Sequence, residues 1–310
     1  MVTNLNFDFM KLRKTAMTIS AILLLLSMVS LATKGLNLGL DFTGGTLLEV
    51  SYQQPADIQK IRSQLEVSGF TGSTVQHFGS ETDVLIRMSE AYRDTLGAEV
   101  LESLRAVSLN GDGMNEVELR RSEFVGGQVG EELRDQGGLA LLMALFVVML
   151  YVAFRFQFKF SVGAVLALFH DVVIILGLFS IFQWDFDLTV FAALLAVIGY
   201  SLNDTIVVAD RIRENFRIVR KGDAIEVMNL SLNQTLGRTI MTSVTTALVL
   251  LALMLLGGEL IHNFALGLLI GVIVGTYSSI YVAANILLMM NISREDLIPA
   301  ELEEEVDDLP

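Results

Sequence analysis

The sequence predicts a membrane protein: an all-α bundle of six transmembrane helices with one inserted small α+β domain, of ferredoxin-like type and extracytoplasmic. Hydrophobic residues make up 53% of the 310 residues and charged residues only 18%, whereas a soluble domain carries about 25% charged residues. The mean hydropathy is +0.58. The apolar residues gather in six runs, each long enough to cross a bilayer as a helix. The long stretch between the first two runs has an ordinary composition.

The six runs give the organisation of the chain. They cover residues 15–32, 139–154, 161–182, 188–209, 236–256 and 263–290. Lys and Arg cluster before the first run and in alternate short links after it, which places both termini in the cytoplasm. The predicted divisions are a cytoplasmic N-terminus at 1–12, a first helix at 13–34, a periplasmic domain at 35–136, five helices at 137–292 and an acidic cytoplasmic tail at 293–310. A cleavable signal peptide is the alternative for the first run, and the tail is either a solvated segment or a docking site.

Charge and composition exclude several classes of function. The net charge is −14, and the tail from Arg294 onward contributes half of it. This acidity disfavours a nucleic-acid partner, which would need a basic patch. The absence of cysteine excludes disulfides, Cys-type zinc sites, iron–sulfur clusters and thiol catalysis. His77, His170 and His262 lie far apart, so no metal site is expected. We also expect no cofactor, and no catalytic nucleophile–base set points to an enzyme.

The predicted periplasmic segment, residues 35–136, alternates between strand and helix periodicity. Strand patterns cover 46–52, 73–78, 83–88 and 116–125, and helical patterns cover 55–67 and 91–107. The resulting order β-α-β-β-α-β is that of a ferredoxin-like domain. The fold by itself indicates no function.

Asp204 is an ionisable residue inside the fourth apolar run. Such a residue costs roughly 2.5–3.5 kcal/mol on insertion scales, so it is a functional candidate by default. Tyr200, four residues earlier, shares its helical face, and Asn203 directly precedes it. The carboxyl either takes up and releases protons or forms a structural hydrogen bond between helices.

Arg238 opens the fifth run and is followed by Thr242 four residues later. One interpretation makes it the charge partner of the carboxylate, because an opposite charge nearby favours ionisation. The other makes it an interfacial arginine that reaches the lipid headgroups.

Asp171 and His170 lie in the middle of the third run. Asp171 is either a second relay group for protons or a neutral, hydrogen-bonded structural residue. His170 is either a relay or a packing residue, and packing is favoured.

Glycines mark two further features. The stretch 39–46, with Gly39, Asp41, Gly44 and Gly45, follows the first run. It is predicted to be a tight turn into the first strand rather than an anion cradle, since it lacks the Lys-Ser/Thr ending of a nucleotide loop. In the sixth run, small residues recur in steps of four at Gly267, Gly271 and Gly275, a pattern that lets another helix approach closely.

Five motifs together resemble one family. They are Gly-Leu-Asp-Phe-Thr-Gly-Gly-Thr at 39–46, the glycine-rich stretch at 125–133, Gly-Tyr-Ser-Leu-Asn-Asp-Thr at 199–205 with its continuation to 215, Asn-Gln-Thr-Leu-Gly-Arg-Thr at 233–239, and 271–283. In this order they resemble the SecF family of bacterial protein-export subunits.

The resemblance implies a function. Members pair with SecD in a twelve-span unit of the resistance-nodulation-division transporter type. That unit assists the SecYEG channel in the inner membrane and uses the proton-motive force to draw preproteins across; YajC is a further candidate partner. The family's coupling aspartate falls on Asp204 and its arginine on Arg238. No role is implied for Asp171, which stays a candidate from its position alone.

Two other functions stay open at this point. One is a proton-driven exporter of small molecules or lipids on the same fold, although the outer segment is small for a substrate pocket. The other is a passive scaffold subunit, for which Asp204 would be dispensable.

Overall fold

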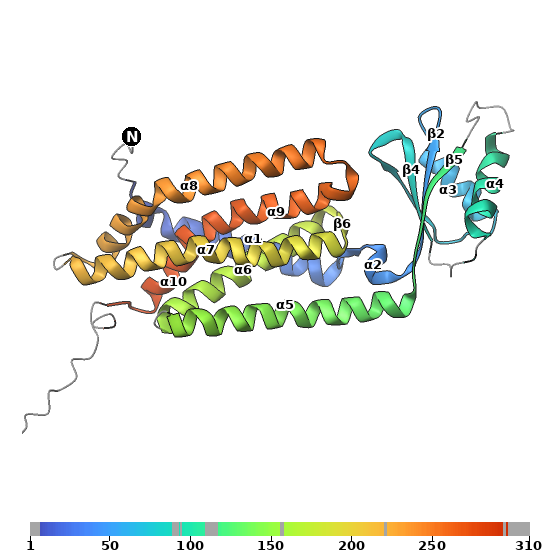
Figure 1. Ribbon diagram of the computed structural model, residues 1–310. Coiled ribbons are helices and arrows are strands. Elements are labelled where there is room, and N and C mark those ends of the chain that lie inside the picture. The colour runs from blue at the N-terminus through green and yellow to red at the C-terminus, as the bar shows by residue number, and fades with distance from the viewer. Residues whose placement is uncertain are drawn as a thin grey trace, which may run out of the picture.

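A computed structural model describes residues 7–88, 93, 95–108, 117–155, 158–219, 222–293 and 296 (Figure 1). Within these residues, six helical stretches are long and apolar enough to cross a membrane, as predicted. They are η1 and α1 (Phe9–Leu12 and Arg13–Thr33), α5 (Gly127–Arg155), α6 (Phe158–Phe182), α7 (Leu188–Ile218), α8 (Ala224–Leu256), and the continuous run of α9 (Glu259–Ser278), η2 (Ser279–Ala283) and α10 (Ala284–Met289).

Burial differs strongly among these helices. In their most apolar windows, 61% of α6 and 50% of α7 is buried, against 11% of both α5 and α8. The core therefore lies around α6 and α7, while α5 and α8 run along the outside of the bundle (Figure 1). Most exposed large hydrophobic side chains of the bundle lie on α1, α5 and α8. This is expected for helices whose outer faces contact apolar groups that do not belong to this chain.

The inserted domain between α2 (Leu40–Thr43) and α5 is called the outer domain after its predicted location. It contains β2 (Gly45–Tyr52), α3 (Ile58–Val67), β3 (Thr74–Phe78), β4 (Ser80–Met88), α4 (Leu96–Ser108) and β5 (Val117–Val125). This is the predicted order of elements. The four strands form one sheet in the order β3-β4-β2-β5 with all neighbours antiparallel. Side chains such as Leu48, Ile86, Leu65 and Val100 form its core between the sheet and the two helices.

Several boundaries differ from the predicted ones. The first domain helix begins at Ile58 rather than at 55, because Asp57 caps it by accepting hydrogen bonds from the backbone N–H groups of Gln59 and Lys60. At the other end of the molecule, α7 and α8 continue well beyond their apolar runs. Asp223 caps α8 through the N–H of Glu226. Hydropathy alone cannot detect such polar helical extensions.

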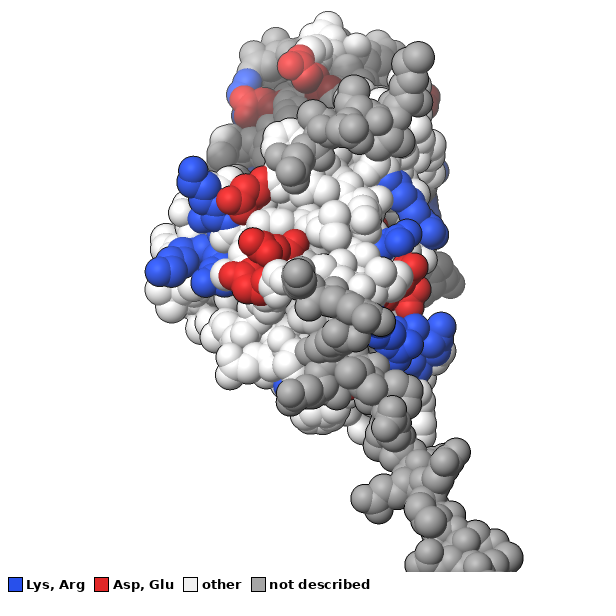
Figure 2. Space-filling view, turned by 90° about the vertical axis from the view of Figure 1, so that its left-hand side faces the viewer, with Lys and Arg blue, Asp and Glu red and all other residues white. Residues whose placement is uncertain are grey.

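The two ends of the bundle differ in what they carry. The outer domain lies at one end, and the link between α7 and α8 and the end of α10 lie at the other (Figure 1). Asn229 near the start of α8 donates to Asp8 and holds the start of η1 at the same end. Basic and acidic side chains both appear on this end face (Figure 2). Apart from Ser293 and Asp296, the acidic tail lies outside the described residues.

The end of the bundle nearest the outer domain has two features that were not predicted. The short helix α2 lies where a tight turn was expected. The strands β1 (Asn37–Leu38) and β6 (Asp185–Phe186) pair in parallel. They join the link after α1 to the link between α6 and α7, so the segment that leads into the outer domain is fixed to the bundle.

Candidate functional site

Asp204 lies on α7 and is 6% exposed. Its Oδ1 accepts a hydrogen bond of 2.9 Å from the hydroxyl of Thr239 on α8. Its Oδ2 is buried and accepts no hydrogen bond from any described residue. A buried carboxyl oxygen without a donor is costly for a carboxylate, so the site suits a group that binds a proton.

Arg238 does not pair with Asp204 in this structure. The arginine is exposed, and it is absent from the ion pairs within 4.0 Å among the described residues. Its charge reaches Asp204 only at longer range. Neighbouring helical residues point about 100° apart, so α8 can turn only one of Arg238 and Thr239 toward α7. In this conformation Arg238 and Asp204 form no direct ion pair among the described residues, and the assignment of Arg238 as the charge partner stays a prediction.

Arg238 instead lines a polar pocket of about 380 Å³ between α5, α7 and α8. Arg211, Asp210, Glu214 and Tyr151 also line it. Arg211 is paired with Glu214 at 2.9 Å.

The supporting residues do not gather around Asp204 as a group. Tyr200 has a buried hydroxyl that forms no hydrogen bond with a described residue. Asn203 is exposed on another face of α7. Thr242 donates to the carbonyls of Arg238 and Thr239 within its own helix. Only Tyr200 has the burial expected of a group that acts on the carboxyl.

Asp171 is fully buried, and its partners were not foreseen from the sequence. Its Oδ2 accepts hydrogen bonds from Ser201 on α7 at 2.6 Å and from Ser278 on α9 at 2.8 Å. Its Oδ1 lies 2.9 Å from Nδ1 of His170. Nε2 of His170 lies 3.2 Å from the hydroxyl of Ser20 on α1. Four helices thus meet at a buried polar cluster that includes His170, and the choice between a packing and a relay role for His170 stays a prediction.

The glycines of α9 let α7 approach closely at two of three positions. A Cβ atom on Gly271 would lie 2.1 Å from Cγ2 of Val197, and one on Gly275 would lie 3.0 Å from Ser201. At Gly267 the nearest side chain is at 3.7 Å, an ordinary contact. The contact at Gly275 also brings Ser201 beside the helix that carries Ser278.

The glycine stretch after α1 is a joint between three parts of the chain. Gly39 caps α2 (Leu40–Thr43), and its N–H donates to the carbonyl of Phe186 at 2.8 Å. Asp41 accepts from the N–H of Leu188, at the start of α7. Gly44 has a φ of +68°, and a Cβ atom added to it would lie 2.6 Å from the Cα atom of Gly127. The end of α2 therefore packs directly on the start of α5. Gly45, with φ of +121°, then begins β2.

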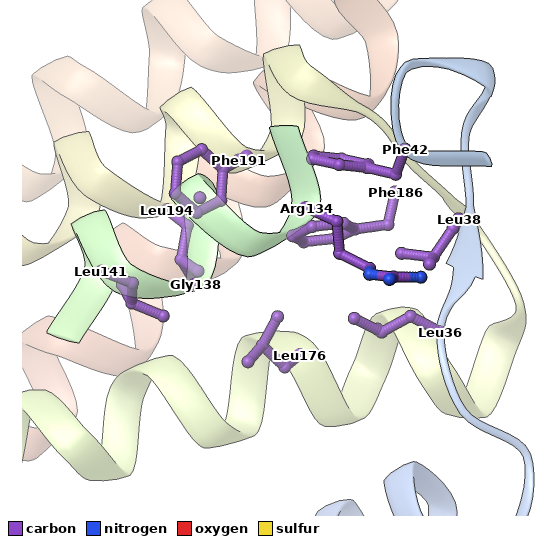
Figure 3. Close-up of a pocket in the computed structure, with 11 residues that line it drawn as sticks. Leu36, Leu38, Phe42, Arg134, Gly138, Leu141, Leu176, Phe186, Phe191 and Leu194 are labelled. Atoms are coloured by element: carbon purple, nitrogen blue, oxygen red, sulfur yellow. The ribbon is translucent and has the colours of Figure 1, made fainter. Parts of the chain in front are cut away.

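An apolar pocket of about 180 Å³ lies beside this joint. Figure 3 shows that it is lined by Leu36 and Leu38 from the link after α1, by the Phe42–Phe186 pair, and by residues of α5, α6 and α7. The guanidinium of Arg134 lies close to Leu36 and Leu38 in this view (Figure 3). In the part of the chain that the structure describes, no group of His, Asp and Glu side chains is suited to hold a metal.

The comparison with known proteins agrees with this architecture. Residues 107–293 match the family described as "Protein export membrane protein SecD/SecF, C-terminal", and residues 29–56 match the "SecD/SecF GG Motif". The chain belongs to the SecD/SecF family. The GG motif of the family covers Gly44 and Gly45, and the C-terminal family region contains Asp171, Asp204 and Arg238.

Individual members of the family are similar over nearly the whole chain. "Protein translocase subunit SecF" of Pseudomonas aeruginosa is 52% identical over 98% of this chain and 97% of its own length. The subunit of the same name from Vibrio alginolyticus is 50% identical over 96% of this chain and 94% of its own length.

Solved structures of the family are larger than this chain. The crystal structure of SecDF, a translocon-associated membrane protein from Thermus thermophilus, has a TM-score of 0.82 at 37% identity and covers 93% of this chain. A super-membrane-facing form of SecDF has a TM-score of 0.69 at 38% identity and covers 94%. This chain spans 39% of the length of each.

Proposed function

We propose that the chain is an auxiliary subunit of the Sec protein translocase that, together with SecD, uses the proton-motive force to promote preprotein translocation across the inner membrane. The observation that carries the proposal is the buried Asp204 carboxyl of α7, which has one oxygen without a hydrogen-bond donor in a chain of the SecD/SecF family. SecD is the proposed partner because the solved SecDF chains contain a matching region within a chain that is more than twice as long. SecYEG, YajC and the preprotein are proposed partners from the family resemblance.

The coupling step is a change in the protonation of Asp204. In the conformation described here, Thr239 bonds one carboxyl oxygen and Arg238 lies outside the helix contact. When Asp204 ionises, a small rotation of α8 would bring Arg238 toward it, because a buried carboxylate is stabilised by an opposite charge. Re-protonation would restore the Thr239 contact. Asp171 is the second candidate for this role.

The available energy is adequate for such a step. One charge that crosses 100 mV gains about 2.3 kcal/mol. That is enough to change the ratio of two conformations by roughly fiftyfold, since each 1.4 kcal/mol is a factor of ten.

The outer domain is proposed to be a ferredoxin-like periplasmic module that holds emerging polypeptide and hinders its return. Its strand order supports the ferredoxin-like assignment. Both termini are proposed to be cytoplasmic, since the Lys- and Arg-rich links fall at the end of the bundle opposite this domain (Figures 1 and 2). The joint at Gly39–Gly45 would carry helix movement to the domain, because it contacts both α5 and the start of α7.

The test is preprotein translocation into inverted vesicles that contain SecD, the channel and either the wild-type chain or Asp204→Asn, with and without a proton gradient. The gradient-dependent part of translocation is expected to disappear in Asp204→Asn while the complex still assembles. Glu226→Gln is the control, since Glu226 is an exposed carboxylate near the start of α8 that does not line the pocket of Arg238, and its loss should leave the gradient effect intact. Full gradient stimulation in an assembled Asp204→Asn complex would leave a passive scaffold as the better description.

A further inference from the structure

We propose that His170 and Asp171 form a second proton-storing site of this chain, separate from Asp204, and that Ser20 and Tyr277 make α1 responsive to its proton content. The proposal rests on the proposed function only in its last step, which assigns the stored proton to coupling. The storage itself is a property of the hydrogen-bond network.

The pair is isolated from solvent and contacts side chains of α1, α7 and α9. His170 is 2% exposed and Asp171 is 0% exposed. Around the pair, α1 presents Ser20, α7 presents Ser201, and α9 presents Ser278 and Tyr277. Tyr277 is the titratable side chain in this set, and its ring stacks on that of His170 with centroids 6.2 Å apart.

Other titratable groups lie further out. Asp204 is three residues beyond Ser201 on α7. Tyr281 packs against Tyr277 with ring centroids 5.4 Å apart. Within the described part of the chain, the hydrogen bonds and ion pairs of His170 and Asp171 involve no Lys or Arg side chain. Any net charge on the pair therefore has no close counter-charge of that kind.

The hydrogen-bond donors can be assigned in sequence, starting from a group that can only accept. The Tyr277 hydroxyl lies 2.6 Å from the backbone carbonyl of Ala16, so its single proton is donated there. The Ser20 hydroxyl lies 3.0 Å from the same Tyr277 oxygen, and must therefore donate its own proton to it. Since that uses the only proton of Ser20, Nε2 of His170 has to donate to the Ser20 oxygen at 3.2 Å.

The Nδ1 side of the His170 ring determines where the second proton lies. Nδ1 of His170 and Oδ1 of Asp171 are 2.9 Å apart, and one proton must lie between them for a hydrogen bond to exist. The pair therefore holds two protons, as imidazolium with carboxylate or as neutral imidazole with carboxylic acid. Both forms have zero net charge, which a low-dielectric site requires.

Loss of one proton changes the contact with α1. Without a proton on Nε2, the ring nitrogen becomes an acceptor and Ser20 must turn its hydroxyl proton toward it. The Ser20 and Tyr277 oxygens would then face each other at 3.0 Å with no proton between them. The Ser20–Tyr277 hydrogen bond would be lost, while the bond from Tyr277 to the carbonyl of Ala16, also on α1, would remain. The chain runs from α1 into the joint at Gly39–Gly45, which leads to the outer domain. The proton content of the pair is therefore coupled to that joint.

The first test reads the protons directly, in the chain assembled with SecD in lipid bilayers. A His77→Gln, His262→Gln variant leaves His170 as the one histidine of this chain, and ¹⁵N labelling restricted to this chain's histidine reports both ring nitrogens by solid-state NMR. We expect Nε2 to be protonated at neutral pH. We also expect either a protonated Nδ1 or, in infrared difference spectra against Asp171→Asn, a protonated carboxyl. An unprotonated Nε2, or an ionised Asp171 beside a singly protonated ring, would overturn the proposal.

The second test uses the donor assignment itself. Tyr277→Phe keeps the stacked ring but removes the acceptor of the Ser20 proton, so Ser20 has to redirect that proton. We expect the Nε2–H signal to persist, because the pair stays neutral only with both protons, but to change in chemical shift, because the Ser20 oxygen that accepts from Nε2 has lost its own partner. Tyr281→Phe is the matched control and should keep the wild-type shift. Identical Nε2–H shifts in Tyr277→Phe and wild type would contradict the assigned network.

The functional step is tested separately by gradient-dependent translocation. His170→Gln and Asp171→Asn are expected to lose the gradient effect, while Ser30→Ala, which removes a buried hydroxyl elsewhere on α1, is expected to keep it. Unchanged stimulation in both pair variants, with the NMR result as expected, would remove the coupling role and leave Asp204 as the coupling acid. Failure of Asp204→Asn to affect translocation would instead bear on the proposed function and leave the NMR assignment intact.

Discussion

Arg87 on strand β4 donates two hydrogen bonds to Asp185 in the link between α6 and α7, with N···O distances of 2.7 and 3.2 Å. The same carboxylate accepts from Asn37 at 2.7 Å and from Gln76 at 3.1 Å. The side chains of the ion pair are only 20% and 17% exposed. A bidentate, partly buried pair of this kind is stronger than a surface ion pair. The outer domain is therefore clamped to the bundle and not merely tethered by its two chain connections.

Arg87→Ala should release this clamp. Hydrogen bonds to charged groups contribute roughly 1.5–3 kcal/mol, and the variant would remove two of them while leaving Asp185 with weaker donors. We expect a broader distribution of spin-label distances between β4 and α7 in electron-resonance measurements, with the domain itself still folded. Arg120→Ala is the control, because Arg120 contacts Asp83 within the domain at 3.6 Å and does not reach the bundle. Identical distance distributions in Arg87→Ala and wild type would show that the clamp is not needed.

The sequence was sufficient for the features that depend on local patterns. Apolar runs identified the six spanning stretches, and strand and helix periodicity gave the element order of the outer domain. The pairing of β1 with β6 was missed because two residues carry no periodicity.

The candidate site depended more on tertiary packing. Buried acids could be recognised as costly in a membrane, so Asp204 and Asp171 were found. Their partners could not be found, since Ser278 is separated from Asp171 by 107 positions and nothing in the sequence fixes how α9 is rotated. Arg238 was predicted as the charge partner of Asp204 from its opposite charge and from the family resemblance, whereas the structure turns Thr239 toward the carboxyl. Ser201 had a usable signal, as it lies one turn before Asp204 in the same motif.

Gly271→Ala should destabilise the contact between α7 and α9. The new methyl group would lie 2.1 Å from Cγ2 and 2.7 Å from Cγ1 of Val197, and a β-branched side chain has little freedom to move away. Overpacking of this kind costs typically 1–3 kcal/mol, so a lower midpoint of thermal unfolding in detergent is expected. Gly267→Ala, with its nearest contact at 3.7 Å, should be tolerated. Val197→Ala should restore much of the stability of Gly271→Ala, and the absence of such rescue would mean that the clash lies elsewhere.

The docking of the chain after α10 should depend on pH. A hydrogen bond from Lys159 at 2.6 Å and another from the backbone N–H of Ser293 lower the pKa of Asp296 below its ordinary value of 3.8. Because the folded pKa is lowered, the stabilisation is fully present above pH 3.8 and is lost as the pH falls through the folded pKa. Amide hydrogen exchange at Ser293, corrected for intrinsic rates, is expected to rise only below pH 3.8. In Asp296→Asn it should already be fast at neutral pH, whereas slow exchange there would assign the protection to other contacts.

Thr239→Val should impair coupling without loss of the fold. Thr239 is 1% exposed and supplies the hydrogen bond that Asp204 receives from α8. Valine has nearly the same shape, so the packing of α8 persists while both carboxyl oxygens lack a donor from that helix. If the Thr239 contact holds α8 in one of two orientations, its loss should reduce the gradient-dependent part of translocation by severalfold, and Thr239→Ser should restore it. Thr242→Val is the matched control, since the Thr242 hydroxyl bonds only to carbonyls of its own helix. Equal losses in both valine variants would point to a general effect of removing hydroxyls from α8 rather than to the Asp204 contact.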